Sequence, residues 1–140
     1  MAIVYFDSSA LVKLVVDEEG SDLAAALWDG CDAAMSSRLA YPEVRAALAA
    51  AAGDQRIDTR SFQTAQGDWE TFWSATWPVE LTVAVERHAG RLADAYALGG
   101  ADAVHLASAL AIGPSDLVVA VWDRRLRDGV ISAGLRIAPT

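Results

Sequence analysis

The chain has little of what marks a secreted or membrane protein. It contains one cysteine, Cys31, and cannot form an internal disulfide, which fits the reducing cytoplasm. Its longest apolar runs, such as residues 117–122, are far too short to cross a bilayer. The N-terminus also lacks the basic, then apolar, then small-residue order of a signal peptide. We therefore expect a cytoplasmic protein that is stabilised by its core and not by disulfides.

Positive charge is also scarce. Eleven Lys and Arg residues stand against 19 Asp and Glu, giving a net charge of −8, and Lys13 is the only lysine. Proteins that bind nucleic acid through a broad phosphate footprint are usually basic. Either this protein does not bind nucleic acid, or bound cations change the sign of an acidic site and a partner supplies further positive charge.

Glycine-rich nucleotide motifs are missing as well. No Gly-x-Gly-x-x-Gly and no Gly-Lys-Ser/Thr follows a predicted strand, so dinucleotide and P-loop binding are unsupported. The sequence must therefore supply any chemistry from other side chains.

What the sequence does contain is an alternation of strands and helices. Residues 3–6 and 117–122 are apolar runs typical of buried strands, and weaker strands are predicted at 33–36, 79–81 and 135–137. Helices are predicted at 9–16, 21–28, 42–53, 58–77, 82–99, 101–110 and 124–132. This order predicts a single three-layer α/β/α domain over residues 1–140, with a central, mostly parallel sheet of four or five strands.

Four acidic residues occupy equivalent places in this order. Asp7 and Asp123 directly follow the two strongest strands, while Glu43 and Asp102 lie in the first turns of helices. In an open parallel sheet, the strand ends and the following helix starts share one edge. One aspartate at a helix start is usually a cap, but four acids on one edge are harder to explain as helix caps alone. Crowded carboxylates call for a compensating cation, and oxygen ligands suit Mg²⁺ or Mn²⁺.

Four segments surround these acids, and together they resemble the successive motifs of the PIN-domain family. The segments are DSSALVKL (7–14), PEVRAAL (42–48), ADAVHLASA (101–109) and WDRRL (122–126). In spacing and length the chain is most similar to the VapC-type toxin ribonucleases of that family, and the resemblance covers nearly the whole chain.

The resemblance implies a PIN-like fold and a Mg²⁺- or Mn²⁺-dependent endoribonuclease, the toxin of a type II toxin–antitoxin pair. It also implies RNA as substrate, a VapB-type antitoxin as partner, and a homodimer that forms a heterotetramer or larger assembly with the antitoxin. On motif position, Asp7, Glu43, Asp102 and Asp123 would be the catalytic, metal-binding quartet, with Asp7 and Asp102 the surest ligands. Family members often carry Ser or Thr where this chain has Val121, so Asp123 has the weaker claim.

Other side chains are candidates for support. Ser9 either bonds a ligand carboxylate or a metal-bound water, or is only a helix-start hydroxyl. Arg124 and Arg125 begin a helix, where the dipole disfavours cations, so they contact RNA phosphates or pair with the acidic cluster. His105 lies three residues after Asp102 on the same helical face, and a buried, hydrogen-bonded histidine is favoured over a metal ligand.

An aromatic stripe is predicted on the helix at 58–77, where Trp69, Trp73 and Trp77 recur at intervals of four residues. Base stacking is conceivable. Core packing, or a face for a dimer mate or an antitoxin helix, is the favoured interpretation.

Rival functions lack particular residues. A haloacid-dehalogenase-type phosphatase needs a second aspartate two residues after the first, where this chain has Ser9. A response-regulator receiver needs a lysine at the end of a late strand, whereas Lys13 lies in the first helix. A metal-dependent phosphatase for small phosphoesters and a catalytically inactive PIN-fold binding module remain the alternatives, and the four intact acids argue against the second.

Overall fold

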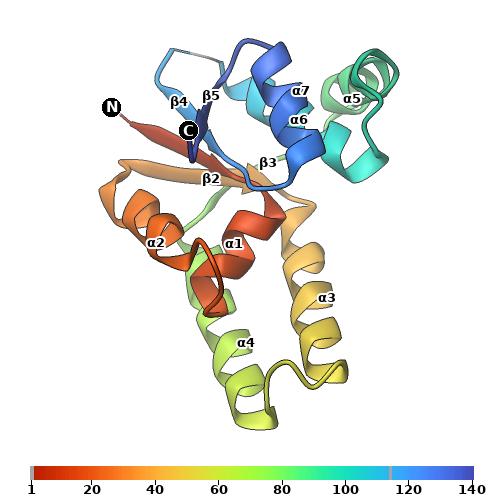
Figure 1. The fold of residues 1–140 in the computed structure, drawn as a ribbon. Coiled ribbons are helices and arrows are strands. Elements are labelled where there is room, and N and C mark those ends of the chain that lie inside the picture. The colour runs from red at the N-terminus through yellow and green to blue at the C-terminus, as the bar shows by residue number, and fades with distance from the viewer. Residues whose placement is uncertain (1, 114) are drawn as a thin grey trace.

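The computed structural model describes residues 2–113 and 115–140, which form five strands and seven helices (Figure 1). The elements in chain order are β1 (Ile3–Phe6), α1 (Ser8–Val15), α2 (Ser21–Gly30), β2 (Ala33–Ser37), α3 (Ala40–Gly53), α4 (Thr59–Ser74), β3 (Trp77–Val79), α5 (Val83–Tyr96), α6 (Gly100–Ile112), β4 (Leu117–Ala120), α7 (Arg124–Ser132) and β5 (Arg136–Ala138).

The strands form one parallel sheet in the order β3-β2-β1-β4-β5. The chain moves outward from β1 through β2 to β3, and then returns to the other side of β1 to form β4 and β5. The carboxyl ends of the paired strands β1 and β4 therefore lie at a topological switch point, the place where ligands bind in open α/β sheets. The predicted α/β fold with its mostly parallel sheet of four or five strands is confirmed.

Alternate residues of β1 supply the two halves of the core. Val4 and Phe6 pack with α1, α3 and α4 on one face, while Tyr5 packs with α5, α6 and α7 on the other. In Figure 1 the sheet lies between these two groups of helices, and α3 and α4 extend away from it as an antiparallel pair. The central strand is thereby buried on both faces and holds the residue that follows it, Asp7, in a fixed place.

The prediction was wrong around Pro78. The helix expected at 58–77 ends at Ser74, and the strand expected at 79–81 is instead β3, Trp77–Val79. Because β3 is an edge strand paired only with β2, a proline without an N–H can sit within it. The aromatic stripe is correspondingly incomplete: Trp69 is fully buried on α4, whereas Trp77 is 68% exposed on β3.

Other boundaries shift by a few residues. The strand expected at 117–122 ends at Ala120, and the last strand begins at Arg136. Ser21 does not cap α2, because its hydroxyl donates back to the Val16 carbonyl oxygen and accepts the Glu18 N–H.

Within residues 2–113 and 115–140, no single helix is long and apolar enough to cross a bilayer. The helices α5 and α6 have that length and apolarity only together, as a pair bent by 116°.

Candidate active site

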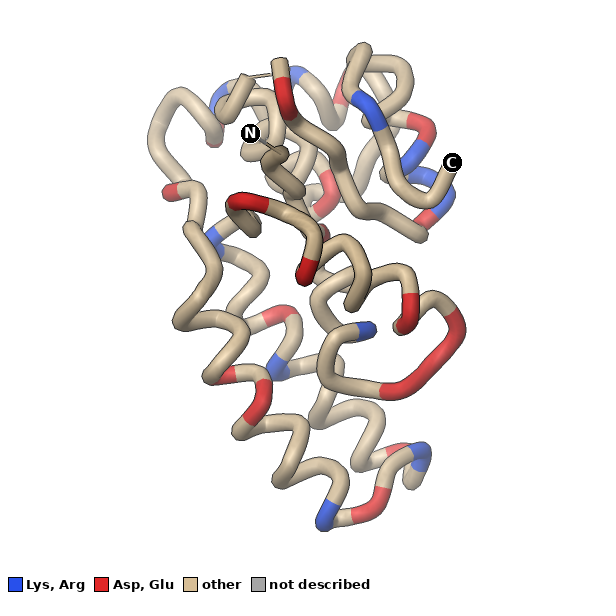
Figure 2. Tube along the Cα trace, turned by 90° about the vertical axis from the view of Figure 1, so that its left-hand side faces the viewer, with Lys and Arg blue, Asp and Glu red and all other residues tan. Residues whose placement is uncertain are grey.

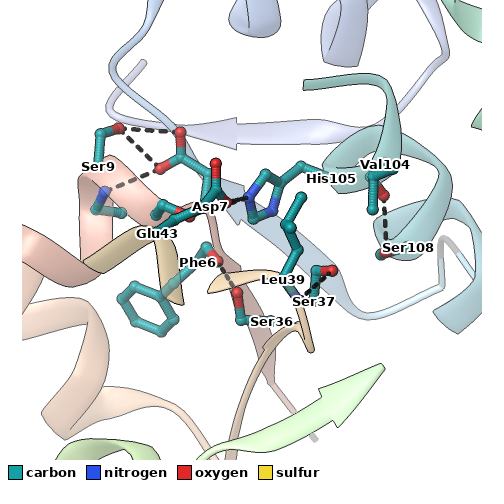
Figure 3. Close-up of polar contacts among 12 residues, drawn as sticks. Phe6, Asp7, Ser9, Ser36, Ser37, Leu39, Glu43, Val104, His105 and Ser108 are labelled. Carbon is teal, nitrogen blue, oxygen red and sulfur yellow. Dashed lines mark hydrogen bonds and ion pairs between the residues drawn. The ribbon is translucent and has the colours of Figure 1, made fainter. Parts of the chain in front are cut away.

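Asp7 lies where β1 gives way to α1. Its side chain is only 4% exposed and caps the helix, because Oδ1 accepts the Ala10 backbone N–H at 2.9 Å. Ser9 Oγ donates to the same carboxylate, 3.0 Å from Oδ1 and 2.9 Å from Oδ2 (Figure 3). This contact fits both roles expected of Ser9, because a hydroxyl at the start of α1 also lies beside the aspartate that caps the helix. These contacts fix the orientation of the Asp7 carboxylate.

The buried surroundings of Asp7 disfavour its ionised form. Burial, aided by the negative charge of Asp102, raises the pKa of Asp7 from 3.8 to about 6. The charge of His105 and the hydrogen bonds from Ala10 and Ser9 act in the opposite direction. Asp7 is therefore a carboxylate that additional positive charge would stabilise.

Glu43 lies in the first turn of α3, as the position of Pro42 predicted. Its Oε1 accepts a hydrogen bond from Ser8 Oγ at 2.5 Å, and His105 Nε2 lies 2.7 Å from the same oxygen (Figure 3). Burial alone would raise the pKa of Glu43, but the hydrogen bonds from His105 and Ser8 outweigh it and hold that pKa below its usual range. Glu43 is therefore ionised and tied to both α1 and α6.

Asp102 and Asp123 complete the acidic cluster. Asp102 is half-buried in the first turn of α6, and its pKa is raised first by burial and then by the negative charges of Asp123 and Glu43. Asp123 is exposed and caps α7, accepting the Leu126 backbone N–H at 2.9 Å. Because the charge of Asp102 also raises the pKa of Asp7, Asp102 is the residue that couples all four acids.

The four carboxylates form a loose cluster. In residues 2–113 and 115–140, no three side chains of His, Cys, Asp or Glu lie in an arrangement that could hold a metal ion as it stands. Two of the acids, Asp7 and Asp123, are also helix caps, so the ordinary structural role of such residues is present here beside any chemical one. Together the four carboxylates can attract a cation to this edge of the sheet.

Arg124 and Arg125 lie beside the cluster at the exposed start of α7. The positive charge of Arg125 partly offsets the upward shift in the pKa of Asp102. Neither arginine forms an ion pair within the described part of the chain. Both guanidinium groups therefore remain available to an anionic ligand.

Two members of the site, Tyr5 and Ser8, were missed by sequence reasoning. The Tyr5 hydroxyl lies 2.7 Å from His105 Nδ1, and Ser8 joins Glu43 to His105. His105 itself is 3% exposed and fully hydrogen-bonded, so its predicted character is confirmed. The available signal was the spacing of Asp102 and His105, but nothing local could indicate contacts with residues about 100 positions away.

Comparison with known proteins identifies the family and the fold. A family model described as "PIN domain" matches residues 4–128. Ribonuclease VapC45 of Mycobacterium tuberculosis (strain CDC 1551 / Oshkosh) and Ribonuclease VapC49 of strain ATCC 25618 / H37Rv are each 67% identical to this chain over 139 residues, covering 99% of it and 96% of their own length. The crystal structure of VapBC2 from Rickettsia felis, bound to a DNA fragment from their promoter, shares the fold with a TM-score of 0.67 at 11% identity, over 96% of both chains.

Proposed function

The chain belongs to the PIN domain family, and from this premise we propose that it is a VapC-type endoribonuclease, the toxin of a type II toxin–antitoxin pair. It hydrolyses RNA phosphodiester bonds at the sheet edge where β1 and β4 end. The observation that carries the proposal is the coupling of Asp7 and Asp102, whose pKa values are both raised at this edge. Acids that resist ionisation together are typical of a site that takes up a cation.

The donor set fits a hard divalent cation. All four acids offer only oxygen, which suits Mg²⁺, or Mn²⁺ in its place, better than a soft metal. We assign Asp7, Glu43, Asp102 and Asp123 to hold it. An ion held there would supply positive charge beside the phosphate and would lower the pKa of an attacking water.

The chain's own residues prepare the site for RNA. Ser9 and the Ala10 N–H hold the Asp7 carboxylate in one orientation, so that little reorganisation is needed when positive charge arrives. Arg124 and Arg125 contact RNA phosphates beside the acids, which explains two unpaired arginines at a helix start where the dipole disfavours them. An acidic protein can thereby bind a polyanion at one place.

A VapB-type antitoxin is the proposed protein partner, bound to a homodimer of this chain in a heterotetramer or larger assembly. Figure 2 shows acidic positions along much of the trace, in keeping with the net charge of −8. A partner segment that carries Arg or Lys would complement this surface and steer association. A basic side chain inserted among the four acids would also compete with the cation, which gives inhibition an electrostatic route.

The proposal is tested with purified protein and total cellular RNA. We expect cleavage with Mg²⁺ or Mn²⁺, none with EDTA, and a loss of at least about 100-fold in Asp7→Asn and Asp102→Asn, since each removes a charge that holds the ion. Asp22→Asn is the matched control, because Asp22 is also a first-turn acid but lies on α2, outside the site. Protein that leaves RNA intact with both metals, or cuts it equally well in EDTA, would contradict the proposal.

A further inference from the structure

A buried chain of hydrogen bonds leads from the sheet to Glu43, and the reaction proposed above does not use it. Tyr5 on β1 is wholly buried, and its hydroxyl lies 2.7 Å from Nδ1 of His105 on α6. The other ring nitrogen, Nε2, lies 2.7 Å from Glu43 Oε1 on α3. Three elements that are far apart in sequence thus meet through one imidazole.

The partners fix which nitrogen of His105 carries a proton. Glu43 has a lowered pKa and is a carboxylate, so it only accepts hydrogen bonds, and Nε2 must donate. In a neutral imidazole Nδ1 is then the acceptor, and its donor is the Tyr5 hydroxyl. Burial raises the pKa of Tyr5, so the phenol keeps its proton. In this neutral form, hydrogen-bond donation runs in one direction, from Tyr5 to His105 to Glu43.

These hydrogen bonds involve only one of the two carboxylate oxygens of Glu43. Oε1 receives both the Ser8 hydroxyl and His105 Nε2, whereas no hydrogen bond to Oε2 is found among the described residues. A glutamate has several rotatable bonds, and Oε1 is anchored to two neighbouring elements. Oε2 is left as the oxygen that can serve a cation.

We propose that Tyr5 and His105 are positioning residues, which hold Glu43 by Oε1 and the Nε2–H tautomer so that Oε2 is available at the metal site. The inference rests on the proposed function, because it takes Glu43 to be a metal ligand. It follows the general pattern in which partners behind a ligand orient it and contribute to metal affinity. Neither residue touches the reacting atoms.

The tautomer is tested first, on metal-free wild-type protein in EDTA at pH 7.5. The chain has two histidines, so a His88→Gln variant assigns the ring ¹⁵N signals of His105. We expect Nε2 to carry a proton, because it faces the Glu43 carboxylate. Tyr5→Phe should keep the proton on Nε2, because Glu43 still accepts from it, but the ring loses the partner that fixes Nδ1. A wild-type ring protonated at Nδ1 and not at Nε2 would overturn the inference, because Nε2 could then not donate to Glu43.

Metal affinity is tested next, by titrating the metal-free proteins with Mn²⁺ in a calorimeter. Tyr5→Phe should weaken Mn²⁺ binding by about 10-fold. Tyr41→Phe is the matched control, because it too removes a phenol that donates to a carboxylate, Glu70, which is not one of the four acids. His105→Gln retains a donor near the Nε2 position and should bind Mn²⁺ more tightly than His105→Ala.

The outcomes separate this inference from the function beneath it. If wild-type protein and Tyr5→Phe bind Mn²⁺ equally well, and the substitution lowers only the free energy of unfolding, the hydrogen bonds through His105 are merely structural. The inference then fails. If wild-type protein binds no Mn²⁺, the proposed metal site itself is wrong and the inference falls with it. If His105→Ala does not fold, the Mn²⁺ affinity of Tyr5→Phe still tests the inference.

Discussion

Asp7 meets two conflicting demands at the scale of a single residue. Its carboxylate caps α1 and accepts three hydrogen bonds, yet it is buried and its pKa is raised to about 6. In the unfolded chain the same group has a pKa near 3.8. Folding therefore favours the protonated form, and the native state loses stability as the pH rises from about 4 to about 6.

This conflict predicts that Asp7→Asn stabilises the metal-free protein at neutral pH. An amide keeps an oxygen for the Ala10 N–H and is as good a cap as a carboxylate, but it carries no charge to bury. The rise in the pKa of Asp7 from 3.8 to about 6 corresponds to about 3 kcal/mol. Asp7→Asn should therefore increase the free energy of unfolding by up to that amount above about pH 6, and by nothing below about pH 4. Urea unfolding in EDTA at several pH values measures the gain.

Asp58 provides the matched control, because it too caps a helix. It is exposed and accepts the Ser61 N–H at 2.7 Å, and that backbone hydrogen bond lowers the pKa of Asp58. Asp58→Asn should therefore bring no gain at neutral pH. An Asp7→Asn protein less stable than wild type at pH 7.5 would contradict the electrostatic account of Asp7.

Single residues also show how far the sequence can predict the site. Asp7, Ser9 and Glu43 could be placed because their roles depend on neighbours within a few residues, through capping and the proline rule. The contacts of Tyr5 with His105 span 100 positions and depend on how the sheet and α6 pack. No local pattern encodes such a contact.

At the scale of elements, the turn between α1 and α2 contacts the end of β4. Gly20 directly precedes α2 and has φ of +91°. A Cβ there would lie 2.8 Å from Nε1 of Trp122, the residue before Asp123. Lys13 lies over the same indole, 5.2 Å from the ring centroid. The glycine is needed both for its backbone conformation and for this close approach.

Gly20→Ala should therefore cost about 2 to 4 kcal/mol, the sum of left-handed strain and overpacking against Trp122. Gly134 is the matched control, with φ of +86° and no atom within 4 Å of its would-be Cβ. Gly134→Ala should cost only about 1 kcal/mol of backbone strain. Urea unfolding measures the loss of stability in each variant. Equal losses would show that the Trp122 side chain moves aside at no cost and that the close approach is unimportant.

Elements were predicted best where sequence signals agree. The helix at 124–132 was placed correctly because Asp123 caps it and an apolar strand precedes it. The region around Pro78 failed because proline ordinarily marks a break, and only the position of β3 at the sheet edge permits it in a strand. Edge position follows from the order of the whole sheet, which no single segment reveals.

At the scale of the whole molecule, negative charge opposes the compact state. The net charge is −8, and the sheet edge gathers four of the acids, two of them with raised pKa values. Simple salt should therefore stabilise the metal-free protein moderately by screening, with a Debye length of about 8 Å at 0.15 M. A cation bound among the acids acts in addition, because it stabilises the native state specifically.

Mg²⁺ should thus raise the melting temperature beyond the effect of NaCl at equal ionic strength. At a concentration of a hundred times Kd the added stability is about 2.7 kcal/mol, which corresponds to roughly 5 to 10 °C for a chain of this size. The double variant Asp7→Asn/Asp102→Asn lacks the two coupled acids, so its melting temperature should respond to both salts alike. Calorimetric melting curves of both proteins in matched salts provide the measurement. If the wild type responds to MgCl₂ only as it does to NaCl, the acidic edge is a screened cluster of caps and not a cation site.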